Sequence, residues 1–393
     1  MDGSLRNPLF SCSSGDIFKI MSKYYFIQPT DQALASGSSA LRLLPFFPLL
    51  LLLLLLLSAC SSQVPGDADA PKMEPLYWPA PPQQPRIEWV KEIRIFNRGG
   101  LNPGFWHKLS EGLFGRQDIG LRRPQAVLFD AQQRLFVVDS GAGMIHWLDM
   151  NSGKYTVLPE DENEAFFSLV GIAEDDVDRI YVTDSEQGKI FRYDLSDKNF
   201  SSFASTMSRP TGIVFNPANK FLYVTETGSH QVVVFDLNGD EQFRFGDRGN
   251  EKGMFNFPTH IAVDRQGQVL VTDSLNARVQ IFSPEGGYLC SFGQAGDSSG
   301  TFAKPKGVAV DSDNNIYVAD ALFDAIQVFG PCGEQLLLAF GQSGAKPGEF
   351  WMPNGIFIDV NDFIYVADSY NQRVQVFRYL KEGEKEKRVE GKK

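Results

Sequence analysis

The chain has 393 residues, 43% of them hydrophobic, with 36 glycines and 22 prolines. This composition is sufficient for a full hydrophobic core and is typical of many short strands joined by turns. The net charge of −11 argues against a nucleic acid as partner, because an acidic surface repels the phosphate backbone.

The first element along the chain is an apolar run over 43–57 that ends in consecutive leucines. It is shorter than the roughly 20 residues that a membrane-spanning helix needs, and it is typical of the hydrophobic region of a secretory signal. We therefore assign 1–59 to a signal peptide and expect the true start to lie later than Met1.

The residues directly behind this run, Leu57-Ser58-Ala59-Cys60, resemble the lipobox of bacterial lipoproteins. The resemblance implies that Cys60 is acylated and becomes the mature N-terminus, so that the protein is held at a membrane by its acyl chains. Because Ser61 stands where an aspartate would favour the inner membrane, the resemblance implies an outer-membrane lipoprotein of the cell envelope, on its periplasmic or surface face. The alternative is an unmodified cysteine behind a membrane anchor.

Residues 60–86 are predicted to form a lipidated, proline-rich linker in extended polyproline conformations. Tyr77 and Trp78 lie within it. They are either a docking spot or, as we favour, aromatic side chains that pack on the domain that follows.

The segment 87–380 repeats one phrase six times, most clearly as Pro353-Asn-Gly-Ile-Phe-Ile-Asp359, Phe363-Ile-Tyr-Val-Ala-Asp368 and Arg373-Val-Gln-Val-Phe377. Self-similarity at this period indicates a repeat architecture. Each unit contains four short runs rich in Val, Ile, Tyr and Phe, separated by Asp, Asn and Gly, which predicts four antiparallel strands. Four-stranded units repeated radially make a β-propeller, so we predict an all-β, six-bladed propeller.

An acidic residue ends the second predicted strand of every unit and is usually followed by a small polar residue. Because Asp and Ser turn the chain by accepting hydrogen bonds from nearby backbone amides, we interpret these acids as structural rather than catalytic. They are Asp139, Asp184, Glu226, Asp273, Asp320 and Asp368.

Two of the units resemble NHL repeats, through Ser369-Tyr-Asn371-Gln-Arg373-Val-Gln-Val-Phe377 and Ser274-Leu-Asn276-Ala-Arg278-Val-Gln-Ile-Phe282. The similarity extends over about 124–377, although the first three units and the fifth lack the Asn/Arg pair. NHL repeats form six-bladed propellers, which agrees with the number of units here.

The sixth unit ends after its third strand, because the charged tail 381–393, which we expect to be disordered, follows. A blade without its outer strand would leave an open edge. The segment Ile87-Glu-Trp-Val-Lys-Glu-Ile-Arg-Ile-Phe96 has a strong β pattern. We predict that this N-terminal strand closes the last blade, and the alternative is a loose N-terminal arm.

Two other features leave questions open. The insertion 101–123 carries Trp106, Phe114 and several arginines, which suit either a binding interface or a plug against a blade edge. The four cysteines show no metal-type or redox-type spacing. We expect no disulfide between Cys290 and Cys332, which fall in neighbouring units.

In a propeller the first strand of each blade lines the central channel, and the residue after each repeat's opening position is expected to ring the channel mouth. We therefore predict a binding site at the mouth. Its candidate residues are Gln125, Thr211, Thr259, His260, Lys306 and Asn354, with Val170 at the equivalent position of the second unit.

His260 stands where four other units have glycine, so its side chain is expected to project into the mouth. A zinc site needs three or four protein ligands, and no other histidine has an equivalent position, so we expect no metal and no cofactor. The gluconolactonase-type hydrolases hold a divalent metal with Glu, Asn and Asp, of which only Asn354 is suggested here. The peptidyl-amidoglycolate lyases use several channel histidines, where this chain offers one.

The sequence thus predicts a lipid-anchored propeller of the cell envelope that binds an unidentified envelope protein or a small ligand, and that has no catalytic residues of its own. The alternative is a metal-dependent hydrolase or lyase, gluconolactonase-like or amidoglycolate-lyase-like, with a site around His260 and Asn354. No nucleic acid is expected as partner.

Overall fold

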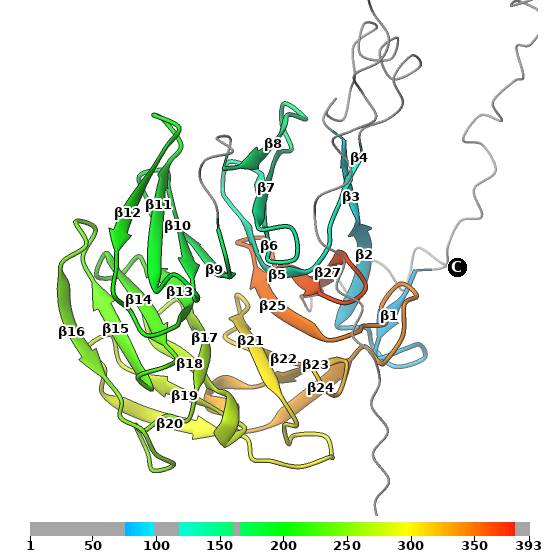
Figure 1. Ribbon diagram of the computed structural model, residues 1–393. Coiled ribbons are helices and arrows are strands. Elements are labelled where there is room, and N and C mark those ends of the chain that lie inside the picture. Colours follow the sequence, from blue (N-terminus) through cyan, green and yellow to red (C-terminus); the bar gives the residue numbers. More distant parts are fainter. Residues whose placement is uncertain (1–74, 98–117, 160–165, 382–393) are drawn as a thin grey trace, which may run out of the picture. The chain divides into compact units, whose positions relative to one another are not determined.

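The computed structural model describes residues 75–97, 118–159 and 166–381. Six antiparallel sheets in this part of the chain are arranged radially around a central channel, with the first strand of each repeat innermost (Figure 1). Apart from two short 3₁₀ turns, Ser274–Asn276 and Pro331–Gly333, the described secondary structure is all strand. The predicted all-β, six-bladed propeller is confirmed.

Blades one to five each contain four consecutive strands. Blade one consists of β5 (Pro124–Phe129), β6 (Arg134–Asp139), β7 (Met144–Asp149) and β8 (Tyr155–Leu158). Blade two consists of β9 (Leu169–Glu174), β10 (Arg179–Asp184), β11 (Lys189–Asp194) and β12 (Asn199–Ala204). Blade three consists of β13 (Pro210–Asn216), β14 (Phe221–Glu226), β15 (Gln231–Phe235) and β16 (Glu241–Phe245). Blade four consists of β17 (Pro258–Val263), β18 (Val269–Asp273), β19 (Arg278–Phe282) and β20 (Tyr288–Phe292). Blade five consists of β21 (Pro305–Val310), β22 (Ile316–Asp320), β23 (Ala325–Phe329) and β24 (Leu336–Phe340).

Blade six combines the two ends of the described chain. It contains β25 (Pro353–Ile358), β26 (Phe363–Asp368) and β27 (Arg373–Tyr379), followed by β2 (Ile87–Ile93) and β1 (Tyr77–Trp78). β2 pairs antiparallel with β27, from Ile87 opposite Tyr379 to Ile93 opposite Val374. The sheet's free edge is therefore moved outward to the two-residue strand β1.

The segment 87–96 is not one strand, however. β2 ends at Ile93, and β3 (Ile95–Asn97) leaves the sheet to pair with β4 (Asp118–Gly120). Tyr77 and Trp78, which the sequence assigned to the linker, form β1 instead. The ring of Trp78 lies 5.9 Å from that of Phe340 and 5.8 Å from that of Phe377, so the packing interpretation is confirmed for Trp78.

The core consists of apolar layers between neighbouring blades. Neighbouring blades cover both faces of each blade's inner strands. The second strands are therefore continuous hydrophobic runs, and hydrophobic and polar residues do not alternate along them. β18 and β22 are buried along their whole length. Single phenylalanines ahead of three first strands, Phe255, Phe302 and Phe350, are fully buried and fill the spaces between blades.

The acids that end the second strands are structural, as predicted. Asp139 accepts hydrogen bonds from the backbone N–H groups of Arg122 and Arg123, at 2.6 and 2.8 Å. Asp320 does the same for Ala303 and Lys304, at 2.7 and 2.9 Å. Each carboxylate thus fixes the loop that enters the first strand of its own blade, and this repeated role explains its recurrence.

The expectation of no disulfide between Cys290 and Cys332 is wrong. The two residues are joined by a disulfide, with Cα atoms 6.2 Å apart, within the usual range for such a bond. Cys290 lies in the outermost strand of blade four, and Cys332 lies in the turn before β24. The bond therefore connects two neighbouring blades near their outer edge.

Several predictions concern residues outside the described ones. These are the signal peptide 1–59, the lipidation of Cys60, the linker up to residue 74, most of the insertion 101–123 and the tail beyond residue 381. Within the described part of the chain, no helix has the length and hydrophobicity needed to span a membrane.

Candidate binding site at the channel mouth

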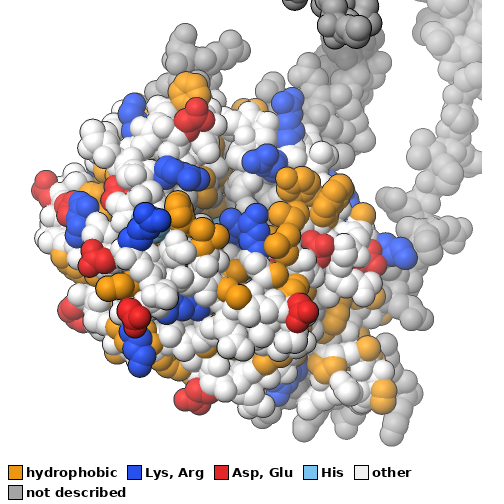
Figure 2. Space-filling view, turned by 60° about the horizontal axis from the view of Figure 1, so that its bottom comes forward, with side chains coloured by type: hydrophobic (Ala, Val, Ile, Leu, Met, Phe, Trp, Pro, Cys, Tyr) orange, Lys and Arg blue, Asp and Glu red, His pale blue; other side chains and the backbone are white. Residues whose placement is uncertain are grey.

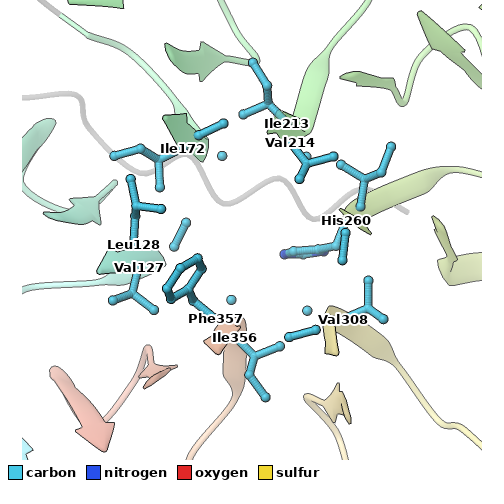
Figure 3. Close-up of a pocket in the computed structure, with 18 of the residues that line it drawn as sticks. Val127, Leu128, Ile172, Ile213, Val214, His260, Val308, Ile356 and Phe357 are labelled. Carbon is cyan, nitrogen blue, oxygen red and sulfur yellow. The ribbon is translucent and has the colours of Figure 1, made fainter. Parts of the chain in front are cut away.

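The central channel contains a cavity of about 230 Å³ that is lined by all six first strands. Aliphatic residues of every blade line it, together with glycines, His260 and Glu174. In Figure 3 the rings of His260 and Phe357 point into the channel. Other labelled residues line it from the strands while their side chains belong to the buried clusters between blades, namely Val127, Leu128, Ile172, Ile213, Val308 and Ile356.

Glycine residues allow neighbouring first strands to lie close together near the mouth of this channel. A Cβ atom on Gly355 would lie 2.4 Å from the backbone oxygen of Gln125, and one on Gly307 would lie 2.5 Å from that of Asn354. Such distances are far inside van der Waals contact. The neighbouring blades can therefore approach to this distance only without a side chain at these positions.

His260 occupies the corresponding position of blade four, and its imidazole points into the channel (Figure 3). Its Nδ1 atom lies 3.1 Å from the hydroxyl of Thr259, and the Asn354 side chain lies within hydrogen-bonding reach of the ring. Burial in the channel and the positive charge of Lys306 lower the pKa of His260 to about 3, against the opposing effect of Asn354. The imidazole is therefore neutral at physiological pH.

Polar side chains continue from His260 on both sides around the mouth. The hydroxyls of Thr259 and Ser274 lie 2.6 Å apart, and the Asn354 amide donates a hydrogen bond to the side-chain oxygen of Gln125. Blades four, six and one thus contribute to one hydrogen-bonded band. Three predicted residues besides His260, namely Gln125, Thr259 and Asn354, are brought together in it.

Lys306 supplies a positive charge beside this band. Burial, together with the charges of Lys304 and Arg209, lowers the pKa of Lys306 to about 8. Among the residues that the structure describes, none of these three cations forms an ion pair. The mouth therefore concentrates uncompensated positive charge in a protein whose net charge is −11.

Thr211 does not join this group. Its side chain is buried, and its hydroxyl lies 2.9 Å from that of Thr225 and 2.7 Å from that of Thr227. These bonds hold the first and second strands of blade three together. Val170 lines the cavity with an apolar side chain.

The same face of the propeller carries exposed hydrophobic side chains that the sequence analysis did not single out. We call this face, which bears Gln125, Thr259, Lys306 and Asn354, the mouth face. Trp351 and Tyr370 lie in two of its loops with their rings 5.5 Å apart, and they are 53% and 50% exposed. The sequence could have indicated them, because Trp351 directly precedes the first strand of blade six and Tyr370 directly follows its second strand. The loops at both of these positions reach the mouth face.

Three further exposed hydrophobic residues lie in loops of the mouth face. They are Phe167, Leu275 and Leu322. Figure 2 shows one face of the molecule on which Lys and Arg side chains and hydrophobic side chains surround a central hollow, with acidic side chains mostly further out.

The opposite end of the channel has acidic character. Glu174 lines the cavity there and accepts a hydrogen bond of 2.7 Å from Arg134, which also contacts Asp130 and Asp178. Burial, and then the negative charge of Asp130, raise the pKa of Glu174 to about 7, with Asp178 adding to the effect and Arg134 opposing it. The two ends of the channel thus differ in electrostatic sign. Within the described residues, no three His, Cys, Asp or Glu side chains are grouped so that they could hold a metal ion.

Comparison with known families divides the propeller into two parts. The family described as the SMP-30/gluconolactonase/LRE-like region matches residues 176–292. The NHL repeat matches residues 302–324 and 350–377, which cover the first two strands of blade five and β25 to β27 of blade six. The protein brain tumor of Drosophila melanogaster is 29% identical over 75 residues, which are 19% of this chain and 7% of that protein, so the chain spans only a small part of that relative's length.

Solved structures with the same architecture are distant in sequence. An auxiliary nutrient binding protein from Bacteroides thetaiotaomicron is 15% identical with a TM-score of 0.54, over 67% of this chain and 70% of that one. A streptogramin B lyase is 13% identical with a TM-score of 0.51, over 67% of this chain and 95% of that one. A catalytically inactive virginiamycin B lyase from Staphylococcus aureus with quinupristin is 14% identical with a TM-score of 0.50, over 74% and 99% of the two chains.

At these identities the similarity establishes the fold and not the activity. The repeat signatures, the matched family regions and the six radial sheets agree with one another. The chain contains NHL repeats in blades five and six and has a six-bladed β-propeller fold.

Proposed function

We propose that this protein is a lipid-anchored binding protein of the cell envelope, and that it holds a protein or ligand partner on its mouth face. The observation that carries the proposal is the combination on one face of an apolar cavity, unpaired cations and exposed aromatic rings. Propeller functions lie in sites carried by the fold, so the site and not the fold is the basis of this proposal.

Export to the envelope is supported by two independent features. The leucine run and Cys60 have the order of a lipoprotein signal. In addition, the disulfide between Cys290 and Cys332 is of a kind that forms and persists in oxidising compartments such as the bacterial periplasm.

The aromatic pair supports binding at the mouth face. Trp and Tyr are enriched among the residues that contribute most to protein interfaces, because each buries a large area at a small cost in side-chain entropy. Trp351 and Tyr370 each expose about half of their surface to solvent. A partner that covers them would remove this apolar surface from water.

A hydrolase or lyase acting at the channel mouth is the second candidate, since the gluconolactonase-like match over 176–292 includes His260. The neighbourhood of His260 favours binding over metal chemistry. The positive charge of Lys306 beside the imidazole would repel a divalent cation, as it already disfavours a proton there. Metal analysis of the purified protein and of His260→Ala decides between the two: stoichiometric metal that is lost in the variant would establish the enzyme candidate.

Capture from the native envelope tests the binding proposal. Acylated protein with Trp351→Ser and Tyr370→Ser is compared with the wild type and with a matched control, Val177→Ser and Val360→Ser, which changes exposed hydrophobic residues in loops at the opposite ends of the first strands. We expect a partner that is retained by the wild type and the control and lost by the mouth-face variant. Equal retention by all three would refute a role for this face.

A further inference from the structure

We propose that the channel binds a small amphiphilic carboxylate, with its apolar body among the first strands and its carboxylate at Lys306. This inference rests on the proposed binding function of the mouth face and names the class of ligand that the channel beneath it would accept.

The walls of the cavity determine the apolar part of the ligand. Val, Ile, Leu and Phe residues from every blade line it, and polar backbone atoms are exposed between them at the glycine positions. A dry apolar cavity of about 150 Å³ can hold benzene. The cavity here, of about 230 Å³, therefore suits a body of about six to eight carbon atoms.

The mouth determines the charge of the ligand. Lys306 is half-buried next to two other cations and, among the described residues, has no carboxylate partner. A cation that is taken from water without a partner destabilises the protein, and an anion at the mouth would relieve that cost. The Asn354 amide, which contacts Gln125, and the Thr259 hydroxyl, which contacts the His260 ring, are further hydrogen-bonding groups of the mouth for a carboxylate.

The far end of the channel determines the orientation. Glu174 lies there with Asp130 and Asp178, and Arg134 donates hydrogen bonds to all three carboxylates. A carboxylate at that end would meet negative charge, whereas at the mouth it meets positive charge. Only the orientation with the carboxylate at Lys306 satisfies both ends.

Isothermal calorimetry on the purified full-length protein tests the inference with three probes, namely hexanoate, 1-hexanol and inorganic phosphate. Hexanoate and hexanol share the apolar body and differ in charge, whereas phosphate has charge without an apolar body. We expect hexanoate to bind about tenfold more tightly than either, because a charge-assisted hydrogen bond is added to apolar burial.

Variants locate the charge that is recognised. Lys306→Met should abolish the preference for hexanoate over hexanol, and Lys306→Arg should retain it. Lys220→Met is the control. Lys220 is an exposed lysine of blade three, at the end of the blade opposite the mouth, and it pairs with Asp176 of blade two. This variant should bind hexanoate like the wild type. The signals of the His260 ring in NMR spectra should shift on addition of hexanoate to the wild type.

The outcomes separate this inference from the proposed function. If hexanoate and hexanol bind equally, the proposed recognition of a carboxylate is wrong, and the channel is a site for apolar ligands only. Equal binding of phosphate overturns the amphiphilic class. No binding of any probe overturns the inference as a whole, and the mouth face is then still judged independently by the capture experiment with Trp351→Ser and Tyr370→Ser.

Discussion

The guanidinium of Arg373 donates a hydrogen bond of 2.6 Å from Nη1 to the Glu92 carboxylate, across the seam between the last repeat and the N-terminal strand. Arg373 is fully buried and also forms an ion pair with Asp368, with 2.7 Å between Nε and Oδ2. In blade four Arg278 pairs with Asp273 in the same way. In blade six, Glu92 of β2 adds a second acidic partner for this arginine. The arginine of the repeat signature is thereby linked to the N-terminal strand that completes the last blade.

Removing this connection is expected to weaken the closed ring. Arg373→Met leaves Asp368 buried without its cation, so we expect a loss of about 3–5 kcal/mol in the free energy of unfolding. Glu92→Gln, which keeps the shape of the side chain, should cost about 1–2 kcal/mol because the hydrogen bond loses its charge. Urea denaturation measures both values.

Glu241→Gln is the control for these two variants. It removes an exposed ion pair with Arg244, and such surface pairs contribute about 0–1 kcal/mol. If Arg373→Met were as mild as this control, the seam would not depend on the buried pair.

The disulfide between blades four and five should contribute measurably to stability. It closes a loop with a sequence separation of 42 residues, so replacing both cysteines by serine should lower the free energy of unfolding by about 2–4 kcal/mol. Dithiothreitol should lower the melting temperature of the wild type toward that of the Cys290→Ser/Cys332→Ser variant. A wild-type melting temperature that dithiothreitol leaves unchanged would mean that the bond does not stabilise the fold.

Glu174 is expected to make stability depend on pH. Its pKa is raised to about 7, first by burial and next by Asp130, so the folded protein binds this proton more tightly than the unfolded chain does. Stability is then highest below pH 4.5 as far as this group is concerned, and it falls as the pH rises to about 7, by about 3 kcal/mol at most.

The difference between the wild type and Glu174→Gln isolates this effect from other titrating groups. Denaturation at several pH values should show the two stabilities diverging between pH 4.5 and 7, with the variant losing less stability. Parallel curves would show that Glu174 titrates normally.

Close contact between the first strands gives a steric prediction. A Cβ on Gly355 would lie 2.4 Å from the backbone oxygen of Gln125, so Gly355→Ala should destabilise the protein by about 1–3 kcal/mol through overpacking. Gly330→Ala is the matched control, because its Cβ would meet no atom closer than 3.9 Å and its φ is −67°. Thermal unfolding of both variants measures the difference, and equal melting temperatures would contradict the tight packing of the first strands.

The fold could be predicted from the sequence because its signals are local and repeated. The runs of Val, Ile and Tyr, the Asx turns and the acids that end the second strands recur in every unit. The disulfide could not be predicted in this way, since Cys290 and Cys332 meet through the docking of two blades. The end of β2 at Ile93 was also missed, because β3 has the same β-forming composition.

The candidate site was predicted only in part, because equivalent positions of different blades differ in how their side chains pack. Ile213 lies opposite Val224 and Ile261 opposite Val271, so blades three and four have the same register after their opening prolines. Thr211 and Thr259 also contact equivalent hydroxyls, those of Thr227 and Ser274. Thr211 is nevertheless buried and Thr259 only half-buried, a difference in packing between blades that the repeat pattern does not reveal.

Photocrosslinking in the native cells tests the central claim, that the mouth face is the binding surface. p-Benzoylphenylalanine replaces either Trp351 or Val360, which is 75% exposed in a loop at the opposite end of the first strand of the same blade. Intact-mass spectrometry of the purified protein detects an attached partner of any size. We predict a discrete adduct from position 351 and none from position 360, and adducts from position 360 alone, or equally from both, would contradict the claim.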